Sequence, residues 1–248
     1  MFSNIIEIII LSIVQGISEF LPISSSAHLN IVEIVFEFNS NSLMIDVSLH
    51  LGSLLAILFY FRRELLDLKN NQKLLSLMLI GSIPIVIAGY LISTTGLINL
   101  LENNLKIIAW TSLIFGIVLY LADKTKFDKK ISSDLNFITI LYIGLFQILA
   151  LIPGVSRAGI TITAARLFNF NRFDSSKISF LLAIPAIAGA SVLQLKNAVE
   201  QSFELNYLIL ISITLSFLFS YFTVKYFLEY INKFSLNVFV IYRIIISI

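Results

Sequence analysis

The chain has 248 residues, and 58% of them are hydrophobic, whereas soluble domains average about 45–50%. Only 13% are charged and the net charge is +2, so the composition excludes an ordinary soluble domain. Apolar stretches of about 20 residues recur along the chain, which predicts an all-α integral membrane protein. The absence of cysteine excludes disulfides, thiolate metal sites and a cysteine nucleophile, and the two histidines exclude a histidine-rich metal cage.

A polar stretch at residues 15–28, QGISEFLPISSSAH, interrupts the apolar N-terminal region. Residues 2–18 and 28–38 have patterns typical of helices. Pro22 breaks the chain between them, because it lacks a backbone N–H and disfavours helix at the preceding residue. Neither piece is long enough to cross a bilayer comfortably. We therefore predict a re-entrant helix-loop-helix pair, whose loop is tolerated at membrane depth only if it is buried in protein or lines a wet cavity.

A second stretch has the same layout: residues 136–152 are apolar, Pro153 and Gly154 break the helix, and residues 158–168 resume it. Six further apolar stretches predict transmembrane helices at 43–61, 74–92, 105–121, 178–195, 207–226 and 236–248. Each half then holds one re-entrant pair and three spans. Because three is odd, the second half enters from the opposite side. This predicts a single polytopic domain over 1–248, with inverted halves at approximately 1–123 and 134–248. Eight ordinary spans are the alternative, which would bury both polar stretches in continuous helices.

The placement of charge supports this topology. Thirteen of the seventeen Lys and Arg residues lie in the loops 62–73, 124–130, 172–177 and 225–233 or at Arg166. The opposite loops carry acidic residues at Glu37, Glu102, Glu200 and Glu204. Positive charge marks the cytoplasmic side of membrane proteins. We therefore place the basic loops in the cytoplasm and both termini outside, with the two broken loops entering from opposite faces.

The two broken loops carry complementary chemistry, which predicts one site that handles phosphate. Arg157 is the most informative residue, because a guanidinium binds phosphate oxygens bidentately. Gly154 and Gly159 allow backbone N–H groups to approach an anion, and Ala158 begins a helix whose N-terminus favours negative charge. The alternative is that Arg157 pairs with Glu19 as a structural bridge, and both interpretations are compatible in the resting state.

Glu19 lies where a central membrane charge costs about 2.5–3.5 kcal/mol, which makes it a site residue by default. It could hold a divalent cation or act as a general base. Gln15 lies one helical turn earlier and can face the same ligand. Mg²⁺ or Ca²⁺ would take its remaining oxygens from phosphate and water. His28, beside three serines, suits acid–base or nucleophilic work, although it could be structural. His50 opens a span, and whether it reaches the same cavity is left open.

The two polar stretches resemble the signatures of the bacterial undecaprenyl-diphosphatase family, the bacitracin-resistance proteins of the BacA/UppP type. The family's first signature corresponds here to QGISEFLPISSSAH and its second to PGVSRAGIT, at residues 153–161. Residues 180–191, FLLAIPAIAGAS, resemble a further family stretch. The resemblance covers the whole chain, with similar length and spacing between motifs.

The resemblance implies hydrolysis of undecaprenyl diphosphate to the monophosphate and inorganic phosphate. This reaction recycles the lipid carrier for peptidoglycan synthesis, and extra enzyme confers bacitracin resistance. It further implies a metal-dependent, multi-pass protein of the bacterial inner membrane, with its active site opening to the periplasmic face. Its partners would be the polyprenyl diphosphate lipid and the bilayer, and no nucleic acid. The oligomeric state stays open, with a homodimer as one alternative.

The match assigns roles residue by residue. The catalytic set is Glu19, Ser25, His28 and Arg157, the substrate-binding set is Ser24, Ser26, Gly154, Ser156 and Thr161, and the metal-binding set is Glu19 and Gln15. We predict that Ser25 is the nucleophile with His28 as its base. Water activated by His28 or Glu19 is the rival.

Three positions depart from the family pattern. Gln15 stands where some members have glutamate, which weakens a two-carboxylate metal site. Ala27 replaces a usual glycine, and Ala158 replaces a common serine that could donate to phosphate. A polyprenyl-phosphate flippase or a secondary transporter would use the same inverted-repeat site. Vectorial flux without phosphate release would distinguish it.

Overall fold

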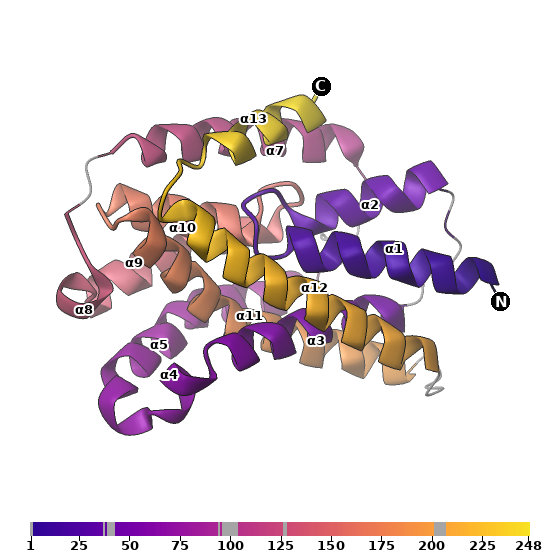
Figure 1. Cartoon of the computed structure of the whole chain (residues 1–248), viewed down its shortest axis with the longest axis horizontal. Helices are drawn as coiled ribbons and strands as arrows, with labels where there is room; N and C mark the ends of the chain where they lie inside the picture. The colour runs from indigo at the N-terminus through magenta and orange to yellow at the C-terminus, as the bar shows by residue number, and fades with distance from the viewer. Residues whose placement is uncertain are drawn as a thin grey trace.

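The computed structural model describes residues 2–36, 38, 43–93, 95, 104–125, 128–200 and 207–248, with the backbone alone for residues 2–4, 68–69 and 196–200. Within these ranges the regular structure is helical, apart from one isolated bridge between Lys129 and Phe170. The prediction of an all-α chain is confirmed (Figure 1). The first half contains α1 (Phe2–Ser18), α2 (Ser25–Phe36), α3 (Leu43–Tyr60), α4 (Arg62–Leu66), α5 (Leu68–Ser93) and α7 (Leu105–Asp123). The remainder contains α8 (Ile131–Asp134), α9 (Phe137–Gln147), the 3₁₀ turn η1 (Ile148–Leu151), α10 (Arg157–Leu167), α11 (Arg172–Glu200), α12 (Tyr207–Ile231) and α13 (Asn237–Ile246).

Five helical segments of the described chain are long and apolar enough to cross a membrane: Leu43–Tyr60, Asn70–Ser93, Leu105–Asp123, Arg172–Leu195 and Tyr207–Ile231. They correspond to five of the six predicted spans. The sixth, predicted at 236–248, is the ten-residue helix α13. Ten residues cover about 15 Å, half of the roughly 30 Å hydrocarbon core. The Leu236 N–H donates to Asp123 Oδ2 at 3.2 Å, and this contact fixes the turn from which α13 starts.

The two polar stretches form two broken helix pairs, α1–α2 and α9–η1–α10. The second helix of each pair begins directly after a serine with positive φ, Ser24 at 77° and Ser156 at 71°. Such a conformation is uncommon for residues other than glycine. Strained residues of this kind collect at functional sites. The helix breaks therefore fall where Pro22 and Pro153 predict them, with α2 starting three residues and α10 one residue earlier than expected.

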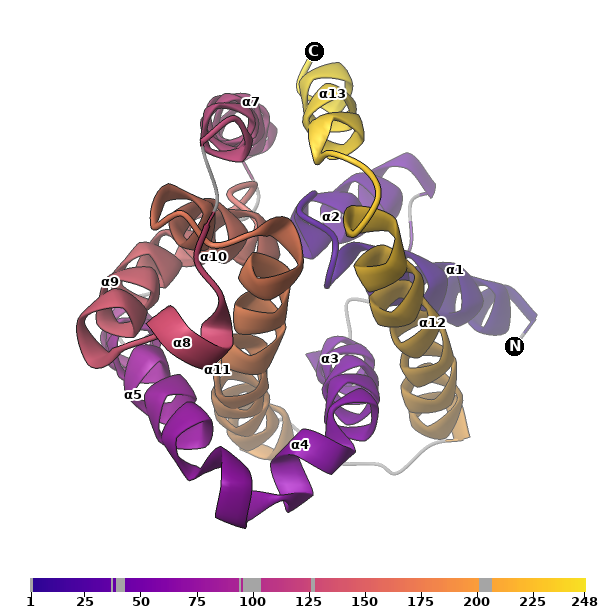
Figure 2. The ribbon, with the colours of Figure 1, turned by 60° about the vertical axis from the view of Figure 1, so that its left-hand side comes forward.

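The helices pack around the two broken pairs with a repeated arrangement. α1 packs on α12 and α9 packs on α5, while α11 contacts α3, α5 and α10 (Figure 2). α7 and α13 lie side by side above them (Figures 1 and 2). The α3–α12 pair is joined by hydrogen bonds from Ser216 Oγ to the Leu49 carbonyl at 2.6 Å and from Ser220 Oγ to Ser53 Oγ at 2.9 Å. Serine contacts and small residues are typical of helix association in membranes.

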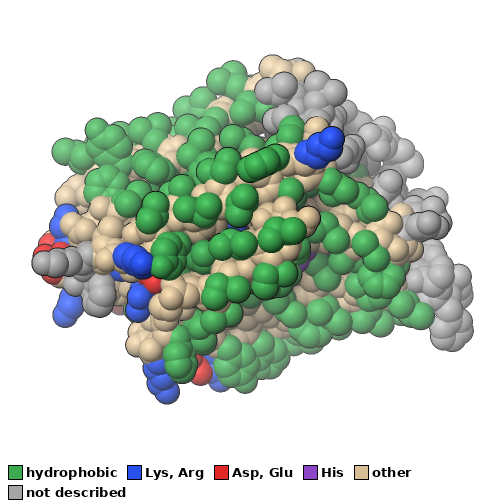
Figure 3. Space-filling model, turned by 90° about the horizontal axis from the view of Figure 1, so that it is seen from above, with side chains coloured by type: hydrophobic (Ala, Val, Ile, Leu, Met, Phe, Trp, Pro, Cys, Tyr) green, Lys and Arg blue, Asp and Glu red, His purple; other side chains and the backbone are tan. Residues whose placement is uncertain are grey.

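The surface is largely apolar, and Lys and Arg gather mostly at one end of the molecule (Figure 3). This agrees with a protein whose sides face lipid. The acidic residues expected at the opposite end, Glu37, Glu102 and Glu204, lie outside the described residues, as does the side chain of Glu200. Of the predicted charge asymmetry, the described residues therefore show only the basic end.

Gly52 tests the close α3–α12 packing, because a Cβ added there would lie 2.5 Å from the Ile213 carbonyl oxygen and 2.8 Å from Ser216 Cβ. We expect Gly52→Ala to destabilise the protein by about 1–3 kcal/mol, the usual cost of overpacking. Gly89→Ala is the matched control, since its Cβ would meet nothing nearer than 3.8 Å. It should leave Tm unchanged or raise it, because alanine favours helix. Thermal unfolding in detergent measures both, and equal Tm values would contradict the packing.

Candidate active site

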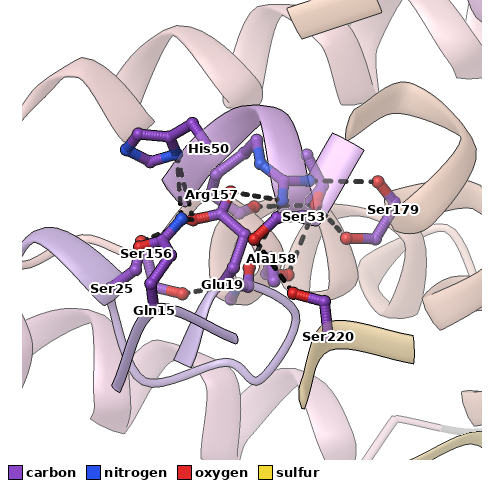
Figure 4. A network of polar contacts seen from close by, with 12 residues as sticks. Gln15, Glu19, Ser25, His50, Ser53, Ser156, Arg157, Ala158, Ser179 and Ser220 are labelled. Carbon is purple, nitrogen blue, oxygen red and sulfur yellow. Dashed lines mark hydrogen bonds and ion pairs between the residues drawn. The ribbon is translucent and has the colours of Figure 1, made fainter. Parts of the chain in front are cut away.

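Glu19 lies at the meeting point of the two loops, directly after α1, with 7% of its surface exposed. Its Oε2 accepts hydrogen bonds from Gln15 Nε2 at 3.1 Å and from Ser25 Oγ at 2.7 Å. Its Oε1 forms an ion pair with Arg157 Nη2 at 3.0 Å. Figure 4 shows Glu19 in the middle, with Gln15 and Ser25 on one side. The structure thus brings together residues of both polar stretches.

Arg157 opens α10 and is nearly buried, with 13% of its side chain exposed. Besides the Glu19 carboxylate, its Nη2 donates to the Glu19 carbonyl at 3.3 Å, and its Nη1 donates to the Ser179 carbonyl on α11 at 3.4 Å. The guanidinium therefore meets the carboxylate through one nitrogen, not through the bidentate fork that phosphate recognition uses. A phosphate arriving here could take that fork by displacing the carboxylate.

His50 joins this network from α3, and the sequence left its role open. Its Nδ1 lies 2.9 Å from Gln15 Nε2 and 3.8 Å from Glu19 Oε2, with 29% of its side chain exposed. The Gln15 side chain is fully buried, and its Oε1 has no hydrogen-bond partner among the described residues. A buried amide oxygen beside a carboxylate fits a hard cation that takes further oxygens from substrate and water. The described residues hold no group of three or more His, Cys, Asp or Glu with metal-site spacing.

The serine–histidine pair of the first loop differs from the prediction. Ser25 donates to Glu19. The His28 ring instead donates from Nδ1 to the Ser24 carbonyl, 2.6 Å away, and its Nε2 forms a hydrogen bond with Tyr242 OH, 2.7 Å away. The His28 and Tyr242 rings are also stacked, with centroids 5.5 Å apart. The Ser24 carbonyl and the Tyr242 hydroxyl hold the His28 ring from its two nitrogens, so the ring faces α13. The hydrogen-bond acceptor beside Ser25 is therefore Glu19 and not His28. The exposed Ser26 forms a side-chain hydrogen bond with Ser24 Oγ at 3.3 Å.

Residues of the second loop and of α10 fix the start of α10, where Arg157 lies. Gly154 has a φ of 86°, and a Cβ there would meet Thr111 Oγ1 and the Ile108 carbonyl oxygen, so glycine is required. Ser156 Oγ accepts from the Gly159 N–H at 3.1 Å and caps α10. Thr161 is fully buried, and its hydroxyl donates to the Arg157 carbonyl at 2.8 Å or to Ser179 Oγ at 2.7 Å. Ser156 and Thr161 therefore brace the start of α10.

Two residues of α13 were not predicted from the sequence. Tyr242 orients His28, and the fully buried Arg243 contacts backbone carbonyls of both loops. One signal could have found Arg243, because an arginine inside an apolar stretch is itself a site hypothesis. No comparable signal marks Tyr242, since aromatic residues are common in such helices.

These features define a helical membrane protein with a buried polar site where two broken helix pairs meet. The family model described as bacitracin resistance protein BacA matches residues 8–248, and the chain belongs to this family. It is 92% identical over 248 residues to an undecaprenyl-diphosphatase of Pelagibacter ubique, covering 100% of this chain and 97% of the relative. Undecaprenyl-diphosphatases of Elusimicrobium minutum and Alteromonas mediterranea are each 38% identical, covering 98% and 97% of this chain and 95% of each relative.

The Glu19–Arg157 pair should show strong energetic coupling. Removing one partner of a buried ion pair costs about 3–5 kcal/mol, because the other charge stays buried alone. We expect Glu19→Gln and Arg157→Met each to lower the unfolding free energy, and the double variant to lose about 1–3 kcal/mol less than the sum.

The control is the Lys177–Glu64 pair, 3.2 Å apart with 21% and 35% of the two side chains exposed, whose coupling should stay below about 1 kcal/mol. Unfolding of all variants in one detergent measures both cycles. Additive losses at Glu19 and Arg157 would contradict the account.

Proposed function

We propose that this protein is an undecaprenyl-diphosphatase, which hydrolyses undecaprenyl diphosphate to undecaprenyl phosphate and inorganic phosphate. The observation that carries the proposal is the buried cluster in which Glu19 joins Ser25 of one loop to Arg157 of the other. A carboxylate, a hydroxyl and a guanidinium meet there in one network, and they would serve as base, nucleophile and anion-binding group. The names of the relatives, at up to 92% identity, support the same activity.

Arg157 and the N-terminus of α10 would bind the diphosphate. The first N–H groups of a helix have no partners within it, and they favour an anion. A phosphate there would form the bidentate contact that the Arg157 guanidinium lacks with Glu19. Phosphoryl transfer is mostly positioning and charge stabilisation, so these groups should supply most of the rate.

Glu19 and Gln15 would hold a divalent cation, Mg²⁺ or Ca²⁺, which supplies further neutralisation of the diphosphate charge. The orphaned Gln15 Oε1 supports this assignment, because it offers a buried oxygen next to the carboxylate. Two protein ligands are few for such a cation, so its other ligands would be oxygens of the substrate phosphates and water.

Ser25 is the proposed nucleophile. Its oxygen would attack the terminal phosphorus while its proton passes to Glu19 Oε2, 2.7 Å away, and the bond to the bridging oxygen breaks to release undecaprenyl phosphate. Water would then cleave the phosphoserine and release inorganic phosphate. His50 Nδ1, 2.9 Å from Gln15 Nε2 and 3.8 Å from Glu19 Oε2, is a second candidate for proton transfer. His28 keeps a proposed role in orienting the Ser24–Ser26 turn. Water attacking directly, with Glu19 as its base, is the rival mechanism.

The finer topology also belongs to this proposal. The pairs α1–α2 and α9–α10 would be re-entrant from opposite faces of the inner membrane, in inverted halves, with the site open to the periplasmic side. The repeated packing of α1 on α12 and α9 on α5 supports it. The apolar tail would lie between helices, open to lipid. A homodimer stays a prediction.

Phosphate release from undecaprenyl diphosphate by the purified protein in detergent tests the function. We expect release with Mg²⁺ or Ca²⁺, none with EDTA, and a loss of roughly a thousandfold or more in Arg157→Ala, the scale of an arginine that binds the transferred phosphoryl group. Arg62→Ala is the control, because Arg62 is exposed at the start of α4. A folded protein that releases no phosphate with any metal would redirect the proposal to lipid transport.

The nucleophile is tested separately by trapping. Substrate labelled with ³²P in its terminal phosphate should leave label on the protein in an acid quench, and Ser25→Ala should abolish both label and turnover. Ser76→Ala, an exposed serine of α5 outside both loops, is the control and should retain labelling. Near-normal turnover in Ser25→Ala would end the covalent mechanism and leave direct attack by water.

A further inference from the structure

Arg243, on the short helix α13, connects three parts of the fold. Its Nε donates to the Ser112 carbonyl of α7 at 3.1 Å. In the second loop, Nη2 donates to the Gly154 carbonyl at 2.9 Å and Nη1 to the Val155 carbonyl at 3.1 Å. Nη1 also reaches the Pro22 carbonyl of the first loop at 3.4 Å. The planar guanidinium of one side chain therefore connects both loops to α7.

These contacts are unusual because they contain no carboxylate. Within the described residues, no ion pair includes Arg243, and its acceptors are backbone carbonyls. Arg166 is the other fully buried arginine, and it pairs with Asp123 at 3.3 Å. A buried charge without a counterion is costly, so carbonyl dipoles must offset the loss of water. An apolar residue would fill this space at a lower cost, so packing alone does not explain an arginine at position 243.

The fold leaves space for this guanidinium. A Cβ at Gly159 would lie 2.9 Å from Arg243 Nη1, and a Cβ at Gly116 would lie 3.3 Å from Arg243 Cβ. Glycine at these two positions, one in α10 and one in α7, lets the side chain pass between the helices. The guanidinium thus lies directly behind the first turn of α10.

Arg243 also sets the direction of the peptide groups in the second loop. In a trans peptide the carbonyl and the following N–H point in opposite directions. Because the Gly154 and Val155 carbonyls point at Arg243, the N–H groups of Val155 and Ser156 point away from it. The same contacts fix where α10, and with it Arg157, begins.

We propose that Arg243 is a positioning residue for the diphosphate site: by holding carbonyls of both loops it keeps the start of α10 and the first loop in register around one phosphate. This proposal rests on the proposed function, and it assigns to α13 a role in organising the site. Arg243 would act through the backbone, because the hydrogen bonds described for it go to carbonyls and not to the side chains of the Glu19 network.

The test is Arg243→Lys, which keeps the positive charge but cannot donate to four carbonyls in a fixed plane. Arg166→Lys is the matched control: it also changes a fully buried arginine, but about 14 Å farther along α10 than Arg157. Both variants are compared with wild type for Tm, for the Kd of pyrophosphate obtained from ligand-induced thermal shifts, and for the Ki of orthovanadate. The two constants do not depend on how much of the sample is folded. A purely structural role would therefore move Tm but not the constants.

We expect Arg243→Lys to raise the Kd of pyrophosphate and the Ki of orthovanadate tenfold or more, and Arg166→Lys to leave both within twofold of wild type. Folded Arg243→Lys with wild-type constants would overturn the proposal. If that variant does not fold, Gly116→Ala replaces it, because its Cβ would push on the Arg243 stem. It should raise both constants severalfold, and wild-type constants would again overturn the proposal. Absence of phosphate release by wild type would count against the proposed function, while the pyrophosphate Kd still tests Arg243.

Discussion

The ion pair between Glu19 and Arg157 is the contact on which the site depends. Both charges lie in an apolar helical protein, and each would be strongly unfavourable there without the other. Because Glu19 follows α1 and Arg157 opens α10, the pair forms only if both helix pairs break at the same depth. The ion pair that the fold requires is therefore the same contact that brings the proposed catalytic groups together. The same carboxylate that neutralises Arg157 accepts a hydrogen bond from Ser25, whose proton it would take in the proposed mechanism.

Breaking a helix in a membrane leaves backbone groups that water cannot satisfy, and the structure meets this need with side chains from other helices. The Thr111 hydroxyl donates to the Pro153 carbonyl at 2.6 Å, and Ser156 caps α10. Arg243 donates to the next two carbonyls, those of Gly154 and Val155. Strain and polar groups are thus concentrated where a phosphate has to be bound, and the surrounding helices keep ordinary apolar packing.

Local signals in the sequence were enough for much of the fold. Hydrophobic runs and two prolines predicted the helices and both breaks, because these depend on neighbouring residues. The site needed contacts between distant residues: Arg243 meets Pro22 across 221 positions and His28 meets Tyr242 across 214. No local pattern encodes such pairs, so nothing in the sequence indicated that His28 contacts Tyr242. The start of α13 also involves a distant contact, since the Leu236 N–H donates to Asp123, 113 positions away.

The most direct test of the account asks whether one anion contacts both loops. The chain has no cysteine, so Ser26→Cys introduces a single thiol at an exposed position of the first loop. Maleimide labelling of that thiol is followed in detergent with and without magnesium pyrophosphate. If the loops form one site, pyrophosphate slows labelling, and adding Arg157→Met in the second loop abolishes the protection. Protection that persists unchanged without Arg157 would show that the first loop binds the anion alone and would contradict a shared site.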